Sequence, residues 1–299
     1  MLDLSVVIVN YRCWDVLSKC LESLEKQTIS IKKVIVTDNF SNDGKLSVFR
    51  ERFPWVIWIE EQINGGFSFG CNAGARLVNT KWVLFLNPDT QIPEYCFEGL
   101  LSHCEENPDY KLISIKQIDG NGKDCYPYGI FPNALNFFPP FRSLERNLFK
   151  RSQSKNKNSK SLVAFPDWIS GAFVLIRDED YKKIGPWDEL FWMYYEDIDL
   201  SKRASKLGMK RVLLNDWHCI HEHGGASRRN TNTKILTKSE VLISSHKYIQ
   251  KHLKGTSRAC AHFIVFTFTF LELVILYLFS KVKRGMLKRL VKYWSKAMV

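Results

Sequence analysis

The chain has 299 residues, of which 45% are hydrophobic, and this is enough apolar sequence for one large or two small folded domains. Its formal net charge is +12, but the residues from Lys247 onward hold eleven lysines or arginines against one acid, Glu272. A nearly neutral body with a basic tail argues against a nucleic-acid groove across the fold, and favours a tail that meets an anionic partner.

The start of the chain and its cysteines favour a cytoplasmic protein. Residues 1–9 lead from one acid directly into an apolar stretch and lack the basic segment of a signal peptide, so we expect the amino terminus to stay in the cytoplasm. The eight cysteines are scattered without a CxxC pair, so they are expected to be reduced and mostly buried rather than paired.

Strand and helix signals alternate over about the first hundred residues. Apolar runs of strand length lie at 4–9, 33–37, 55–60 and 82–86, and helical spacing of apolar residues connects Trp14 to Leu24. This alternation predicts an α/β fold with a mostly parallel sheet flanked by helices. Ligands bind beyond the carboxyl ends of the strands in such sheets. The polar residues expected there are Asn10 and Tyr11, Asp38 and Asn39, Asn64 and Gly66, and Asn87 and Asp89.

The remaining sequence predicts an insertion, further regular structure and a tail. Turn-forming residues at about 119–166 predict a long surface insertion, and its polar, basic stretch at 150–160 is expected to be mobile. Regular structure is predicted to resume at 168–177, followed by a helix beginning near Glu196 and a strand at 210–214. The change in charge places a domain boundary after residue 246, with a tail over 247–299.

Two acidic segments could carry chemistry. Asp89 follows a predicted strand in the sequence NPD, where it could bind a divalent cation between two phosphates or could form an ordinary turn. Glu196, Asp197 and Asp199 follow an aromatic run. Acids in the first turn of a helix often only complement its dipole, but a carboxylate against apolar rings can have a pKa suited to taking a proton.

Residues 64–76 are rich in glycine and offer hydrogen-bond donors from Asn64, Asn72 and Arg76 to a polar ligand. The alternative is a glycine-rich helix start that packs on the sheet. The segment lacks GxGxxG spacing after a strand, and the sequence contains no GxxxxGK[ST] motif. Both observations disfavour dinucleotide and P-loop sites.

Residues 217–227 contain three histidines, His218, His221 and His223, together with Cys219. A structural zinc site is one interpretation, but there is a single cysteine and no second pair of ligands. A mixed oxygen and nitrogen metal site that includes a histidine is the favoured interpretation.

Seven segments together resemble the family 2 glycosyltransferases with the GT-A fold, and within them the bacterial rhamnosyltransferase-like branch. The segments are VVIVNYR, TDNFSNDG, NGGFSFGCNAGAR, FLNPDT, WISGAFVLIR, FWMYYEDIDLSKRASKLG and HEHGGAS, in the family's order over about residues 4–230. The resemblance implies a nucleotide-binding half fused to an acceptor-binding half over residues 1–246, followed by a membrane-associating helical tail.

The resemblance also implies roles for individual residues. Val9, Asn10 and Tyr11 are similar to the wall around the nucleotide base, and Asp38 and Asn39 to the base and ribose contacts. The rest of the nucleotide-sugar site would comprise Asn64, Gly66, Asn72, Arg76 and Asn87, and the acceptor or donor pocket would comprise Trp168, Ser170, Gly171 and Glu196.

Asp197 matches the family's catalytic base, and Asp89 is similar to the last acid of its DxD metal motif. Asn87 replaces the first acid, which leaves one fewer charged ligand, and either His221 or His223 resembles the late histidine of the metal site. The implied cofactor is a divalent cation, Mn²⁺ or Mg²⁺, with Mn²⁺ favoured because an imidazole joins the carboxylate. The implied reaction is an inverting single displacement in which Asp197 deprotonates the acceptor hydroxyl.

By resemblance the donor is a nucleotide-sugar, with dTDP-L-rhamnose as the first guess, and the acceptor is a saccharide, expected to be lipid-linked, in cell-surface polysaccharide synthesis. The alternatives are a UDP-hexose donor and a catalytically inactive nucleotide-sugar-binding membrane scaffold. A sugar nucleotidyltransferase is disfavoured because no glycine-rich, basic loop follows the first strand. Nucleic acid is not an expected partner.

Residues 261–279 form a nearly continuous apolar stretch of about the length that spans a bilayer as a helix. A single span would carry the basic residues of 281–296 outward, against the positive-inside bias. The following segment alternates apolar and basic residues at helical spacing, which suits an anionic membrane surface. We therefore expect the tail to lie on or dip into the cytoplasmic face of the cell membrane; the alternative is an ordinary buried helix.

Overall fold

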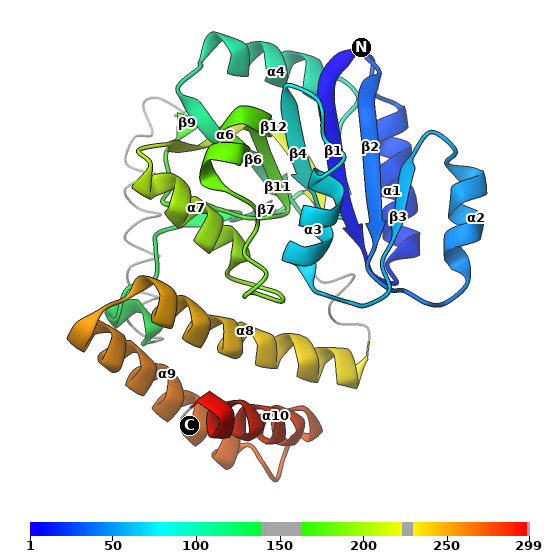
Figure 1. Ribbon diagram of the computed structural model, residues 1–299. Coiled ribbons are helices and arrows are strands. Elements are labelled where there is room, and N and C mark those ends of the chain that lie inside the picture. The colour runs from blue at the N-terminus through cyan, green and yellow to red at the C-terminus, as the bar shows by residue number, and fades with distance from the viewer. Residues whose placement is uncertain (139–140, 142–162, 223–229, 298–299) are drawn as a thin grey trace. The chain divides into compact units, whose positions relative to one another are not determined.

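The computed structural model describes residues 1–138, 141, 163–222 and 230–297, and the chain divides into two compact units (Figure 1). The first unit comprises Met1–Ile130, Ser161–Glu189 and Glu196–Ala226, and the second comprises Phe131–Lys160, Leu190–Tyr195 and Ser227–Val299. The stretch at 150–160, expected to be mobile, lies outside the described residues.

A mixed sheet in the order β3-β2-β1-β4-β11-β6-β12-β5 forms the centre of the first unit, with β7 beside β6 and β9 beside β12. The long pairings of β1 with β2 and β4, of β2 with β3 and of β6 with β12 are parallel, whereas β11 runs antiparallel to β4 and β6. The predicted mostly parallel sheet is thus confirmed. The strands are β1 (Leu2–Asn10), β2 (Ile31–Asp38), β3 (Ile57–Glu60), β4 (Trp82–Leu86), β5 (Thr90–Gln91), β6 (Tyr110–Ile118), β7 (Asp124–Cys125), β9 (Val163–Ala164), β11 (Phe173–Arg177) and β12 (Lys210–His221), and β8 (Tyr128–Gly129) pairs separately with β10 (Trp168–Ile169).

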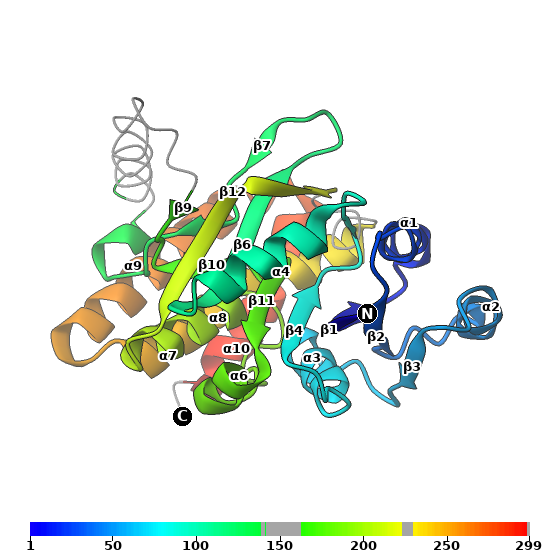
Figure 2. The same cartoon turned by 90° about the horizontal axis from the view of Figure 1, so that it is seen from above.

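Helices cover both faces of this sheet (Figure 2). Successive side chains of a strand point to opposite faces, so Val6 and Ile8 of β1 pack in one core cluster and Val7 and Val9 in another. One face carries α1 (Trp14–Glu25), α2 (Lys45–Arg52) and α4 (Cys96–Glu106), and the other carries α3 (Phe67–Ala75), α6 (Asp178–Ile184) and α7 (Glu196–Lys206). The carboxyl edge of the sheet stays available for polar loops.

The predicted strands appear with shifted ends. The run at 55–60 begins as a strand only at Ile57, and the strand predicted at 210–214 continues to His221 past an irregularity between Leu214 and His218. The helix expected near Glu196 begins at that residue. Within the predicted insertion, residues 119–138 contain β7, β8 and a short 3-10 helix, η1 (Leu135–Phe137).

Three helices, α8 (Thr231–His252), α9 (Gly255–Ile275) and α10 (Lys281–Ala297), form most of the second unit (Figure 1). Ile243 of α8, Leu273 of α9 and Leu290 of α10 share one apolar cluster. The boundary expected after residue 246 falls inside α8. That boundary was predicted from a change in charge along the sequence. Charge is a property of the surface, and the helical backbone of α8 continues through residue 246.

Helix α9 is long and apolar enough to cross a membrane by length and composition, with a mean hydropathy of 1.6. Only 22% of its most apolar 18-residue stretch is buried within the structure. An ordinary core helix would be buried over most of this length, so α9 has an apolar side that the described residues leave uncovered.

Candidate active site

The loops after β1 and β2 are joined by a buried hydrogen-bond network centred on Asp38. Its Oδ1 accepts hydrogen bonds from Asn10 Nδ2 at 3.0 Å and from the Ser41 hydroxyl, and its Oδ2 accepts from the Ser41 backbone N–H at 3.1 Å. Burial raises the pKa of Asp38 above the usual range, and the Ser41 and Asn10 donors oppose that shift. Asn10 Oδ1 is itself occupied by the Cys13 backbone N–H.

Asn39 extends this network to the loop before α3. Its Nδ2 donates to Asn64 Oδ1 at 3.1 Å and to the Gly66 carbonyl at 2.9 Å, and its Oδ1 accepts from the Gly65 backbone N–H. Gly66 caps α3 with a φ of 93°, which favours glycine. Asn10, Asp38, Asn39, Asn64 and Gly66 are therefore brought together at the carboxyl edge, as the sequence predicted.

The other glycines of this segment serve packing. A Cβ at Gly70 would lie 2.6 Å from Val9 Cγ1, and one at Gly74 would lie 2.5 Å from Val7 Cγ1. Glycine at both positions therefore lets α3 lie directly on β1. This is the alternative weighed for the glycine-rich segment, and it also explains why the Val9 side chain is turned into the core.

Asn72 and Arg76 are placed differently from the other donor-site candidates. Asn72 donates to the Trp187 carbonyl and to Glu189, and accepts from the Trp187 N–H and the Tyr181 hydroxyl, so all four of its hydrogen-bonding positions are filled by protein. Arg76 is the C-cap of α3, next to Leu77, whose carbonyl accepts from Lys33 near the amino end of β2. The structure therefore places Arg76 at the opposite end of α3 from Gly66, away from the carboxyl edge.

Asp89 and His221 meet where β5 pairs with the end of β12. Asp89 Oδ1 lies 3.3 Å from His221 Nε2, and both side chains are buried. His221 Nδ1 lies 2.8 Å from Gln117 Oε1 of β6. An amide oxygen only accepts, so Nδ1 donates to Gln117, and Nε2 is the ring nitrogen that faces the carboxylate.

A carboxylate oxygen that faces an imidazole nitrogen is a pair of ligands that a divalent cation can bind, and Gln117 takes the place of the outer hydrogen-bond partner that orients a ligating histidine. Among the described residues, no third acid, histidine or cysteine completes a cluster of three. His223, the other metal candidate, lies outside the described residues.

The loop of Asp89 and the loop before β11 are adjacent, because the Asn87 backbone N–H donates to the Ala172 carbonyl at 3.0 Å. The next residue back, Gly171, donates its backbone N–H to Asp197 Oδ2 at 3.1 Å. A Cβ at Gly171 would lie 3.4 Å from Phe67 and 3.6 Å from Asp197 Cβ. Hydrogen bonds from one short loop, which contains Gly171 and Ala172, thus connect the segment of Asp89 to Asp197.

Asp197 is half-buried at the start of α7, and its Oδ1 accepts a second hydrogen bond from the Ile198 backbone N–H at 2.8 Å. Burial raises the pKa of Asp197, and the Gly171 and Ile198 donors oppose the shift. Burial, then the charge of Asp197, raises the pKa of Glu196 well above its usual range, and Glu196 Oε2 is enclosed without a hydrogen-bond partner. Glu196 therefore holds its proton to higher pH, and Asp197 is the carboxylate available to take one.

Within the described part of the chain, five non-glycine residues have positive φ angles, and all belong to loops around these groups. They are Arg12 after β1, Phe40 and Asn42 after β2, and Tyr194 and Tyr195 directly before α7. Such conformations cost roughly 1–3 kcal/mol each and persist where surrounding contacts enforce them. Their concentration in these loops is typical of a functional site.

The remaining candidates border these loops. Tyr11 is exposed, with the Arg12 guanidinium carbon 5.4 Å from its ring centroid. Trp168 donates its indole N–H to the Ile130 carbonyl, and the Ser170 hydroxyl accepts from the Ala172 N–H.

A sequence profile described as glycosyl transferase family 2 matches residues 5–178, more than half of the chain. The chain belongs to glycosyl transferase family 2. The match includes the Asp38 network, the glycine-rich helix α3, Asp89 and the loop at Gly171, so the family assignment and the site geometry concern the same residues.

Curated relatives of this family 2 glycosyltransferase include rhamnosyltransferases. The rhamnosyltransferase WbbL of Escherichia coli K12 is 26% identical over 229 residues, 72% of this chain and 82% of the relative. The N-acetylglucosaminyl-diphospho-decaprenol L-rhamnosyltransferase of Mycobacterium tuberculosis is 25% identical over 252 residues, 76% of this chain and 78% of the relative.

A solved structure, titled as GalNAc-T7 with UDP, GalNAc and Mn²⁺, superimposes with a TM-score of 0.58 at 14% identity, over 87% of this chain. The chain spans about half of that structure, 54% of its length. This likeness supports the GT-A type fold of the family 2 glycosyltransferase, with its mixed, mostly parallel sheet and flanking helices.

Two polar residues at this site were missed by the sequence analysis. Ser41 bonds both oxygens of Asp38, and Gln117 contacts His221. Gln117 lies in β6, whose sequence YKLISIKQI mixes apolar and polar residues, so the pattern does not single it out. Ser41 lies in a turn, where its sequence context carries no signal either.

Proposed function

We propose that this glycosyltransferase transfers a sugar from a nucleotide-sugar to a saccharide acceptor with inversion and with a divalent cation. The observation that most directly supports this proposal is the position of Asp197. Two backbone N–H groups fix both of its carboxylate oxygens, and one of those groups belongs to the loop that bonds the Asp89 segment. A base and a diphosphate site held by one loop suit a reaction that acts on an acceptor hydroxyl and a leaving nucleotide together.

Asp197 takes the proton of the acceptor hydroxyl as that oxygen attacks the anomeric carbon. The bond from that carbon to the nucleoside diphosphate breaks in the same displacement, so the configuration inverts. The pKa of Asp197, raised by burial, makes it a stronger base than an exposed aspartate. Burial and the charge of Asp197 raise the pKa of Glu196 beside it well above the usual glutamate range, so Glu196 is the weaker candidate for the charged base.

Asp89 and His221 are the residues that would hold the cation, with the diphosphate supplying further oxygen ligands. A bound cation would offset the charge that develops on the leaving diphosphate. Gln117 holds the His221 ring with Nε2 facing this position. Mn²⁺ is favoured over Mg²⁺ because one ligand is an imidazole nitrogen.

The donor site is proposed at the network of Asn10, Asp38, Asn39 and Asn64, with Asn72 as a positioning residue for 187–189 rather than a direct contact. dTDP-L-rhamnose is the first donor to test, supported by the two rhamnosyltransferase relatives. A lipid-linked acceptor is supported by the printed name of the mycobacterial relative. A UDP-hexose donor and an inactive nucleotide-sugar-binding scaffold are the alternatives.

A location on the cytoplasmic face of a membrane is proposed from α9 and α10. The uncovered apolar side of α9 and the basic residues of α10 fit the boundary between acyl chains and anionic headgroups. Such a location would hold the enzyme near a lipid-linked acceptor.

The test is a panel of nucleotide-sugars assayed with the full chain for release of nucleoside diphosphate, with and without Mn²⁺ or Mg²⁺, and with a membrane extract as acceptor source. We expect slow donor hydrolysis without acceptor and faster, cation-dependent release with it. Binding of a nucleotide-sugar without any turnover across the panel would favour the inactive scaffold. Turnover that is unaffected by chelation would remove the cation from the mechanism.

A further inference from the structure

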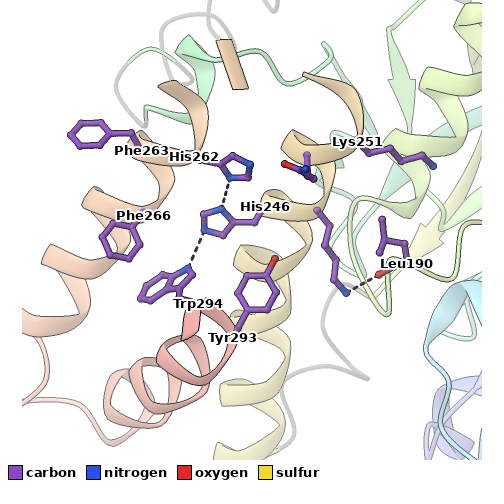
Figure 3. Close-up of a pocket in the computed structure, with 10 residues that line it drawn as sticks. Leu190, His246, Lys251, His262, Phe263, Phe266, Tyr293 and Trp294 are labelled. Atoms are coloured by element: carbon purple, nitrogen blue, oxygen red, sulfur yellow. Dashed lines mark hydrogen bonds between the residues drawn. The ribbon is translucent and has the colours of Figure 1, made fainter. Parts of the chain in front are cut away.

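A cavity of about 760 Å³ lies within the helical unit, between α8, α9 and α10 (Figure 3). This volume is within the range of about 300–1,000 Å³ that is usual for sites of small organic ligands. Lys247 and Lys251 of α8 line one part of it, and Phe263, Phe266 and Trp294 line another. None of the described residues that line the cavity is acidic. The lining therefore combines positive charge with aromatic surface.

A hydrogen-bonded chain of three aromatic rings fixes the tautomers of two histidines beside this cavity (Figure 3). The Trp294 indole N–H, which can only donate, lies 3.3 Å from His246 Nε2, and His246 Nδ1 lies 2.9 Å from His262 Nδ1. His246 Nε2 must accept, so its Nδ1 carries the hydrogen and donates to His262. The hydrogen of His262 then resides on Nε2.

His246 stays neutral in this arrangement, because burial and the neighbouring His262 lower its pKa to about 4. A neutral His246 keeps its one hydrogen on Nδ1, and the Nε2–H of His262 is then a fixed hydrogen-bond donor at the cavity. His262 is only partly buried, so its Nε2–H can donate to a group that enters from outside.

The positive charge of this unit is not cancelled by its own acids. Residues 230–297 contain thirteen lysines or arginines and two acids, Glu240 and Glu272. Arg289 pairs with Glu240 at 2.5 Å, and Lys283 pairs with Glu272. Both acids are thus engaged away from the cavity. Lys247 donates one hydrogen bond to the Leu190 carbonyl at 2.7 Å, and an ammonium group has three donors.

The cavity opens beside the uncovered apolar side of α9. Phe263, which lines the cavity, is 69% exposed, and Leu271, Val274 and Ile275 continue the exposed apolar surface along the same helix. Free phosphate would use the cationic part of this site but leave the apolar surface in water. A phosphate ester with acyl chains would use both.

We infer that this cavity binds the phosphodiester headgroup of an anionic glycerophospholipid. The phosphate oxygens accept hydrogen bonds from Lys247, Lys251 and His262 Nε2, and the acyl chains lie along α9. Trp294 and Tyr293 supply the aromatic surface that is commonly found at the headgroup level. This site is separate from the residues proposed for sugar transfer, and the inference stands on the helical unit alone.

The test is calorimetric titration of the full chain with a short-chain phosphatidylglycerol, kept below its micelle concentration, at about 0.5 M salt, where diffuse charge effects are screened. We expect saturable binding of one lipid per chain. The matched phosphatidylcholine and glycerol phosphate are expected to bind at least about tenfold more weakly, because one adds a cation to the headgroup and the other lacks acyl chains. Equal binding of glycerol phosphate would overturn the lipid assignment in favour of a free phosphate ester.

A matched pair of double variants separates the cavity from the general basic surface. Lys247→Gln with Lys251→Gln removes two charges from the cavity, and Lys288→Gln with Lys292→Gln removes two from exposed positions of α10 outside its lining. We expect the first pair to weaken lipid binding about tenfold or more and the second less than about threefold, since charge-assisted hydrogen bonds are strong and surface charges are screened. Equal losses of lipid affinity in the two double variants would overturn the assignment of the cavity as a lipid-binding site.

His262→Phe tests the fixed donor separately. It keeps an aromatic ring but removes the Nε2–H, and we expect a severalfold loss of lipid affinity with thermal stability close to the parent. Unchanged affinity would overturn the role given to His262. Donor hydrolysis is measured on the same variants and is expected to match the parent, so failure of the lipid site and failure of the proposed transferase activity are distinguishable.

Discussion

Replacing Asp197 with asparagine should abolish most sugar transfer and leave the fold and donor binding nearly intact. The carboxylate accepts backbone hydrogen bonds at both oxygens, from Gly171 and Ile198. The asparagine amide keeps one acceptor oxygen, but its NH₂ group faces the second backbone N–H, so that two donors meet. Losing that hydrogen bond lowers the free energy of unfolding by about 1–3 kcal/mol. The same change removes a buried charge beside Glu196, which offsets part of that cost. We therefore expect only a small shift in the melting temperature.

The loss of activity should be much larger than the loss of stability. Base catalysis contributes about a hundred- to ten-thousandfold, and each factor of ten is about 1.36 kcal/mol, so the barrier should rise by about 2.7–5.4 kcal/mol. The assay is transfer at saturating donor, with nucleotide affinity measured by calorimetry on the same protein. Donor affinity should stay within about threefold of the parent, since general-base catalysis acts on the acceptor side of the displacement.

Asp109→Asn is the matched control, because it removes the same charge from an exposed residue that pairs with Lys210 near the amino ends of β6 and β12. The parent rate should also fall as the pH falls through the pKa of Asp197, which burial places above the usual aspartate range. Transfer by Asp197→Asn within a fewfold of the parent, with the acid limb of the pH profile unchanged, would refute Asp197 as the base.

Four further predictions follow from the same geometry. Asp89→Ala should weaken binding of the intact donor and remove the response to added cation, which calorimetry with and without Mn²⁺ can show; equal responses in variant and parent would contradict the ligand role. Gln117→Leu should weaken Mn²⁺ binding about ten- to a hundredfold by releasing His221, as measured by the spin resonance of free Mn²⁺, whereas unchanged binding would leave Gln117 a packing residue. Glu196→Gln should raise the free energy of unfolding at high pH: a raised folded-state pKa means that the parent loses stability as the pH rises, by up to about 1.4 kcal/mol per pH unit, and parallel denaturant curves for the two proteins from pH 5 to 9 would refute this. Leu278→Ser with Phe279→Ser, at positions 77% and 83% exposed, should lower binding to anionic vesicles about tenfold or more, because each side chain buried in lipid contributes about 1.5–3 kcal/mol; equal flotation would favour a tail that acts by charge alone.

The sequence predicted the strands that begin with continuous apolar runs and the groups at the carboxyl edge of the sheet, because apolar runs and the polar residues after them follow directly from a sheet buried on both faces. It did not predict β6, whose apolar residues are interrupted by Lys111, Ser114, Lys116 and Gln117. It also predicted that a late histidine joins Asp89, which the structure shows for His221. It did not predict Gln117, because the pairing of β6 with β12 joins residues about a hundred positions apart.

Arg76 and Asn72 show a different limit of sequence reasoning. Both lie in the motif of the donor site, but α3 carries Arg76 to its far end and turns Asn72 toward Trp187. Residue type and motif position indicate that a polar group is needed, and only the three-dimensional contacts show whether its partner is a ligand or the protein. The same holds for the boundary after residue 246, where a change in surface charge occurs within the continuous helix α8.

The contact of Gly70 and Gly74 with Val9 and Val7 makes the position of α3 on β1 depend on the side-chain volume of both elements. A methyl group added on the helix side would lift α3, and with it the Gly66 carbonyl that Asn39 binds. The same volume removed from the strand side, by exchanging a valine for alanine, would allow the helix to settle back. The spacing of the network that we propose as the donor site therefore depends on the apolar α3–β1 contact as well as on its polar residues.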